Sequence, residues 1–180
     1  MKLKLICCAL LLCLLSGCGY TYKSVISEKY KTLYVKTFAN KIDITDKITS
    51  KNPYKIYRPG TEQDITNAVI HRFIYDGTLK ITRQDEADLV LTGDLVDYQR
   101  APLRYDENYT NVLEYRVSIT VDITLKNAKT GETLINAQRI ISDKTFATSG
   151  QFQATEIDAL NLATEDLSRK IVEKTVELGW

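Results

Sequence analysis

The stretch VLEYRVSITVDITLK, residues 112–126, decides the fold that we predict for this chain. Every second residue is apolar from Leu113 to Leu125, and the residues between them are polar. Because side chains alternate between the two faces of a strand, this pattern is typical of a strand with one buried face. Fifteen residues at roughly 3.3 Å each give about 50 Å of strand, so a twist or a bulge is expected. The apolar face of this strand must pack against a core, and the polar face meets water or a partner.

The segments on both sides supply the remaining elements. Their patterns predict strands at 32–38, 79–82, 88–99 and 133–146, and helices at 61–75 and 154–178. A right-handed crossover through the first helix makes strands 32–38 and 79–82 parallel, and the later strands form an antiparallel meander. The predicted fold is an α+β two-layer sandwich in the approximate order β-α-β-β-β-β-α. Its sheet is mixed but mostly antiparallel, and both helices pack on one face.

Several local predictions follow from the same patterns. Thr61 with Asp64 resembles a capping box at the start of the first helix, and Gly77 suits its C-terminal end. Strict alternation along 88–99 places Tyr98 on the face opposite Leu89, and it places Asp94 and Asp97 on opposite faces. The stripe that predicts the last helix consists of Ile157, Leu160, Ala163, Leu167, Ile171 and Leu178.

Two segments fit neither a helical nor a strand period. Residues 39–60 read as a long surface loop, and residues 100–111 read as the connection into strand 112–126. We interpret residues 133–146, whose two faces are mixed in polarity, as an edge strand.

The N-terminus has the form of an export signal. Lys2 and Lys4 precede an apolar run at 5–15, which is too short to span a bilayer as a mature helix. The run ends in Leu15-Ser16-Gly17-Cys18, which resembles a bacterial lipobox with Cys18 as the lipidated residue. An ordinary secretory signal with an incidental cysteine is the alternative.

The lipoprotein interpretation sets the expected domain organisation. Residues 1–17 are a cleaved signal peptide, 18–31 a lipidated N-terminal tether and 32–180 a single α+β domain. Only Cys18 of the four cysteines stays in the mature chain, so no disulfide forms within it. Two or three acyl chains on a cysteine anchor a protein stably. Gly19 follows where inner-membrane lipoproteins often carry aspartate, so we expect the periplasmic side of the outer membrane.

Catalytic and metal chemistry have little support in the sequence. The mature chain offers one histidine, His71, which lies off the apolar stripe of its helix, and one lipidated cysteine. The pair Asp94 and Asp97 is assigned to solvated positions, and no glycine-rich phosphate loop is present. We therefore predict a protein that is not an enzyme, with no metal and no cofactor besides the covalent lipid on Cys18.

The most suggestive polar stretch lies at residues 98–116. Arg100, Arg104 and Arg116 are interleaved there with tyrosines at 98, 105, 109 and 115. Arginine binds phosphate bidentately, and tyrosine suits an amphipathic ligand, so a phosphorylated glycolipid is the expected ligand. A nucleic-acid ligand is implausible for a protein that carries an export signal. The alternative is a solvated loop whose aromatic residues cover the sheet edge.

These segments together resemble the LptE family, the lipoprotein of lipopolysaccharide assembly in the outer membrane. The matching stretches are Cys18-Gly19-Tyr20, 35–40 (VKTFAN), Tyr57-Arg58-Pro59-Gly60, Gly77-Thr78-Leu79, 87–93 (ADLVLTG) and 98–105 with the long strand after it. Their order and spacing, over nearly the whole mature chain, carry the resemblance. The loop 41–55 departs from it by its length.

The resemblance implies a plug and assembly partner of the β-barrel LptD in lipopolysaccharide transport and insertion. Arg100, Arg104, Arg116 and Lys126 would contact the barrel or the phosphates of lipid A. The even-numbered face of strand 112–126 would meet the barrel wall. The alternative is an accessory lipoprotein of another envelope assembly or secretion complex, similar to the TolB N-terminal or curli-secretion domains.

Overall fold

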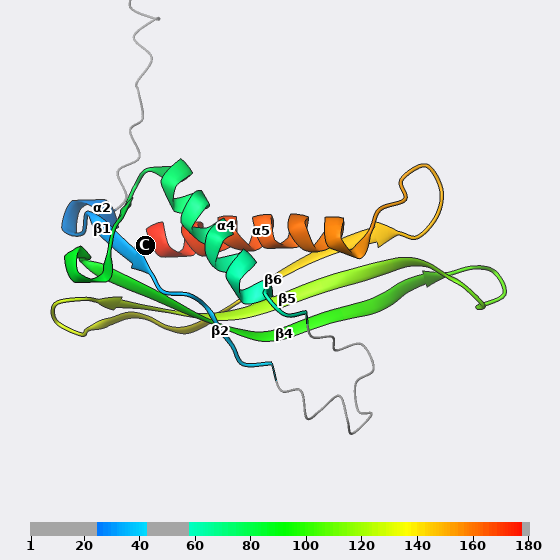
Figure 1. Cartoon of the computed structure of the whole chain (residues 1–180), viewed down its shortest axis with the longest axis horizontal. Coiled ribbons are helices and arrows are strands. Elements are labelled where there is room, and N and C mark those ends of the chain that lie inside the picture. The colour runs from blue at the N-terminus through cyan, green and yellow to red at the C-terminus, as the bar shows by residue number, and fades with distance from the viewer. Residues whose placement is uncertain (1–24, 43–57, 178–180) are drawn as a thin grey trace, which may run out of the picture.

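The computed structural model describes residues 25–42 and 58–177 (Figure 1). The predicted signal peptide, Cys18 and most of the loop 41–55 lie outside these residues. The described elements are α2 (Val25–Lys29), β1 (Thr32–Val35), β2 (Ala39–Asn40), α4 (Thr61–Asp76), β3 (Lys80–Ile81), a 3₁₀ turn η1 (Gln84–Glu86), β4 (Leu89–Tyr105), β5 (Val112–Asn127), β6 (Thr133–Ala147) and α5 (Glu156–Val176).

Six strands form one mixed sheet in the order β3-β1-β4-β5-β6, with β2 paired to β4. β1 is parallel to both β3 and β4, whereas β4, β5 and β6 form an antiparallel meander. The predicted parallel pair, the meander and β6 as an edge strand are therefore confirmed. α4 and α5 both cover the same face of the sheet, which makes the fold an α+β sandwich (Figure 1).

The core lies between the helices and the odd-numbered face of β5. Val117, Ile119, Val121, Ile123 and Leu125 are all fully buried, as the alternation predicted. They pack with the apolar faces of the two long helices, which contribute Ile65, Val69, Phe73, Ala159, Leu160, Ala163, Leu167, Ile171 and Val172. Burying each large apolar side chain stabilises the fold by roughly 1.5 to 3 kcal/mol.

A bulge in β4 overturns two predictions. The register against β5 shifts between Leu95 and Asp97, so the alternation of β4 changes phase. Tyr98 therefore faces the helices and is only 1% exposed. Asp97 lies opposite Thr120, on the same polar face as Asp94, so the prediction that the two carboxylates point to opposite faces is wrong.

The end of β4 and the N-terminal caps of the two long helices differ from the predictions. β4 continues to Tyr105, so residues 100–105 are strand and only 106–111 form the connection. Gly60, in the left-handed conformation, occupies the N-cap of α4 without a side-chain cap, so the Thr61–Asp64 capping box is absent. A capping box does form at α5, between Thr155 and Asp158. Gly77 ends α4 with φ 73°, as predicted.

The N-terminal part of the domain begins earlier than expected. Ile26 of α2 and Tyr30, both in the predicted tether, are buried in the core cluster. Ala39 and Asn40, in the predicted loop, pair with β4 as β2. Within the described ranges, no helix is long and apolar enough to cross a membrane.

Candidate interaction surface at the hairpin end

The 98–116 stretch forms one end of the sheet, which we call the hairpin end: the ends of β4 and β5, the turn 106–111, the loop 148–155 and the start of α5 (Figure 1). The loop is tied to the hairpin because Thr148 donates its backbone N–H to the Leu113 carbonyl and its hydroxyl to the Val112 carbonyl. Asp106 braces the turn by accepting bonds from Thr110 N (2.7 Å) and Asn111 Nδ2 (2.8 Å). These bonds lower the pKa of the Asp106 carboxyl.

A continuous set of contacts crosses the hairpin end from α5 to β6. Glu156, in the first turn of α5, accepts a bond from the Tyr98 hydroxyl at 2.8 Å and from Arg100 Nη1 at 2.6 Å. The Arg100 guanidinium also lies 5.2 Å from the centre of the Tyr115 ring, and that ring stacks on Phe146 at 5.6 Å. Burial first, and the bond to Glu156 second, raise the pKa of Tyr98. Its hydroxyl therefore stays a proton donor.

Apolar side chains gather on the outside of the same end. Tyr109 and Phe152 are more than four-fifths exposed. Tyr109 has a positive φ of 54°, which is unusual for a residue other than glycine, and its ring lies 6.1 Å from that of Tyr105. The exposed large apolar residues at this end are Leu103, Tyr105, Tyr109, Phe152 and Ile157. Ile157, predicted to join the buried stripe of α5, thus faces solvent.

The four predicted basic contact residues do not form one site. Arg100 lies on the helix side of the sheet, where Glu156 holds it. Arg104 and Arg116 lie on the opposite face of neighbouring strands at the hairpin end. Arg104 is 3.6 Å from Glu114, and Arg116 has no ion pair among the described residues. Lys126 is ten residues further along β5 than Arg116, roughly 33 Å away at the usual rise.

The face of the sheet opposite α4 and α5 is polar and, in the described part of the chain, no helix covers it (Figure 1). Its centre is a bidentate ion pair in which Arg139 Nε and Nη2 lie 2.9 and 2.8 Å from the Asp122 carboxylate. Arg139 lowers the pKa of Asp122 through these bonds. We call this surface the bare face.

The described residues were also compared with the requirements of a metal site and of a histidine-based site. No group of three His, Cys, Asp or Glu side chains in that part of the chain could hold a metal ion. His71 is exposed on α4, in agreement with its assignment to a solvated position.

Sequence patterns did not single out Glu156 or Phe152, although both lie at the hairpin end. Glu156 looks like one of many acidic residues on α5, and its role depends on a contact with residues 56 and 58 positions away. Phe152 stands in a predicted break near Gly150. A large aromatic residue in such a loop was the one available signal.

Several solved structures are similar to this chain in fold. The hypothetical protein CT253 from Chlamydia trachomatis has a TM-score of 0.55 at 9% identity, covering 83% of this chain and 97% of that one. Uncharacterized lipoprotein B from Nitrosomonas europaea has a TM-score of 0.54 at 14% identity, covering 82% and 83%. Protein XCC0632 from Xanthomonas campestris also has 0.54 at 14% identity, covering 83% and 88%.

At these identities the solved structures establish the fold alone. No curated protein matches the sequence. Residues 30–175 match the model of the family described as "LptE: Lipopolysaccharide-assembly", a span that runs from Tyr30 through all six strands and nearly to the end of α5. Because this match covers most of the chain and the whole described sheet, the protein belongs to the LptE family.

Proposed function

We propose that the protein is a lipoprotein of the outer membrane, anchored on its periplasmic side by lipid on Cys18. In this role it acts as plug and assembly partner of an LptD-like β-barrel and contacts lipopolysaccharide during its insertion. The family match over residues 30–175 carries the proposal. The function is one of binding and assembly, and we expect no catalytic activity.

The chemistry of the bare face supports the proposal that the partner is a β-barrel. It is long, because β4, β5 and β6 have 17, 16 and 15 residues, and every even-numbered position of β5 from Glu114 to Lys126 contributes a charged or hydroxyl side chain to it. Such a surface offers hydrogen bonds and ion pairs to a polar wall rather than an apolar core. A barrel lumen, which is polar in outer-membrane barrels, matches that chemistry.

The hairpin end supports contact with an amphipathic, phosphorylated lipid. Arg104 and Arg116 lie on the bare face, and Tyr105, Tyr109 and Phe152 expose aromatic rings at the same end of the molecule. Guanidinium groups bind phosphate oxygens, whereas exposed aromatic rings suit the boundary between acyl chains and head groups. Arg100 has a structural part instead, because Glu156 and Tyr115 occupy its guanidinium.

Affinity purification of the tagged chain from outer membranes tests the assembly role. We expect a large β-barrel to be recovered with it. Arg116→Glu reverses a charge on the bare face that has no ion pair among the described residues, so it should lower barrel recovery without lowering the melting temperature. Lys174→Glu, on the surface of α5, is the matched control and should leave recovery unchanged. Recovery of the wild-type chain without any barrel would overturn the proposal.

A further inference from the structure

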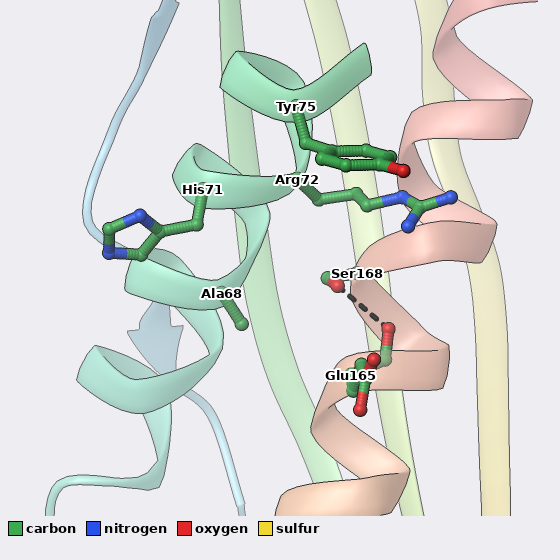
Figure 2. Close-up of a pocket in the computed structure, with 6 residues that line it drawn as sticks. All are labelled: Ala68, His71, Arg72, Tyr75, Glu165 and Ser168. Carbon is green, nitrogen blue, oxygen red and sulfur yellow. Dashed lines mark hydrogen bonds between the residues drawn. The ribbon is translucent and has the colours of Figure 1, made fainter.

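A hollow of about 560 Å³ lies where α4 crosses α5, on the helix layer and away from the bare face (Figure 2). We call it the helix groove, and its lining residues are Ala68, His71, Arg72, Tyr75, Glu165 and Ser168. Its volume falls within the usual range for sites that hold one small molecule, about 300 to 1,000 Å³. The groove is independent of the surfaces assigned to the barrel and to lipopolysaccharide.

Arg72 gives the α4 wall its chemistry. Its guanidinium extends toward α5 beneath the Tyr75 ring, 5.3 Å from the ring centre (Figure 2). Its Nε is buried and has no acceptor, and no carboxylate among the described residues pairs with the group. A guanidinium whose charge no carboxylate balances can bind the two oxygens of a ligand carboxylate through its terminal nitrogens. The α4 wall of the groove therefore favours an anionic ligand.

The α5 wall limits the charge of that anion. Ser168 Oγ donates its proton to the Glu165 carbonyl at 2.7 Å, so toward the groove the hydroxyl offers only lone pairs. The exposed carboxylate of Glu165 lines the same wall. Because this wall consists of acceptors and a negative charge, it tolerates one negative charge at Arg72 better than two.

Apolar surface continues beyond the polar groups on both helices. Tyr75 on α4 is 82% exposed, and Leu162 on α5 is 53% exposed. Leu162 stands one helical turn before Glu165, so the two residues lie on the same side of α5. Ala68 leaves room between the walls because its side chain is short. A ligand with its charged head at Arg72 can thus lay an apolar chain along the groove.

From this geometry we propose that the helix groove binds a single-chain amphiphile with a carboxylate head. The carboxylate pairs with Arg72, the chain lies against Ala68 and Tyr75, and Glu165 disfavours heads that carry two negative charges. The ligand class is that of a medium-chain fatty acid.

Equilibrium dialysis of radiolabelled octanoate against the full-length chain in amphipol tests the proposal, with amphipol alone as the blank. Arg72→Gln removes the guanidinium and should weaken octanoate binding about tenfold or more, the scale of a charge-assisted hydrogen bond. Ala68→Leu fills the groove and should abolish binding. Arg83→Gln is the matched control, because it removes an exposed guanidinium that does not line the groove, and the variant should bind as the wild type does. Circular dichroism melting checks that each variant folds.

Competing ligands test the role of each group. Unlabelled octanol, which has no charge, should displace octanoate poorly. Octyl phosphate, which is close to dianionic at pH 8, should compete more weakly than octanoate, and Glu165→Gln should narrow that difference. Equal binding of octanoate by the wild type and the folded Arg72→Gln variant would overturn the proposal. So would equal competition by octanol and octanoate, which would leave an apolar crevice without a carboxylate site.

Discussion

Gly93 shows how closely the start of the sheet packs against the segment after β1. A Cβ at this position would come within 2.6 Å of three ring atoms of Phe38, which is itself buried. Gly93→Ala should therefore lower the free energy of unfolding by about 1 to 3 kcal/mol, the usual cost of overpacking. Chemical denaturation measures this. Phe38→Leu combined with Gly93→Ala should cost less than the two single changes added, and strict additivity would contradict the close contact.

The carboxylate of Asp88 is one group that makes the stability of the fold depend on pH. Its carboxylate accepts bonds from the backbone N–H of Lys31 (3.0 Å) and Thr32 (3.2 Å) and from Lys129 Nζ (3.1 Å). These bonds, led by that from Lys31, lower the pKa of Asp88 from 3.8 to about 2.

A lowered folded-state pKa sets the sign of the pH effect. The contribution of Asp88 is present above pH 4 and is lost as the pH falls toward 2, by an amount on the order of 1 to 2 kcal/mol. Asp88→Asn should flatten the dependence of the unfolding free energy on pH in that window. Asp85→Asn, which changes an exposed carboxylate, should leave the dependence as it is in the wild type. An unchanged pH profile in Asp88→Asn would contradict this role.

At the level of elements, one carboxylate joins α5 to β4. Glu156→Ala would leave the buried Tyr98 hydroxyl without its acceptor and release Arg100, so we expect a loss of about 1 to 3 kcal/mol in unfolding free energy. The control is Glu173→Ala, which breaks only the solvent-facing pair with Arg169 and should cost about 0.5 kcal/mol or less.

A double-mutant cycle identifies the cause of that loss. Tyr98→Phe removes the hydroxyl itself, so in its background Glu156→Ala should cost less than in the wild type. Equal costs in the two backgrounds would show that the Tyr98 hydroxyl has no part in holding α5.

Most elements were predictable because their patterns are long. The alternation of β5 and the apolar stripe of α4 each repeat several times, and both elements appear within a few residues of their predicted bounds. The bulge between Leu95 and Asp97 was not predictable, because a bulge changes the phase of alternation without changing the types of residue. β2 has two residues, too few for any period.

The candidate site was predictable only in part for a related reason. The sequence pointed to arginines and tyrosines within residues 98–116, and the structure brings Arg104 and Arg116 together on the bare face. Which arginine is held by an ion pair on the helix side of the sheet depends on Glu156, more than 50 residues away, and on the bulge that turns Tyr98 inward. Contacts of such range leave no local signal in a single sequence.

At the scale of the whole molecule, the two faces of the sheet differ in polarity and in what covers them. One face lies under α4 and α5 and supplies the core, whereas the bare face keeps its charges and hydroxyls in the open. Because Arg104 and Arg116 contribute little to the core, natural or designed changes to them should affect partners before stability. Lys126 offers an internal comparison, since it stands on the same face at the other end of β5.

This arrangement makes the proposed lipid contact directional. The double substitution Arg104→Gln, Arg116→Gln should lower the affinity for lipopolysaccharide about tenfold or more, because each guanidinium supplies charge-assisted bonds to phosphate. Lys126→Gln removes one exposed cation from the same face, roughly 33 Å away, and should retain wild-type affinity. Binding of purified lipopolysaccharide to the full chain measures both, and unfolding curves should stay unchanged. Equal weakening by the two variants would instead indicate a diffuse attraction over the whole bare face, without a site at the hairpin end.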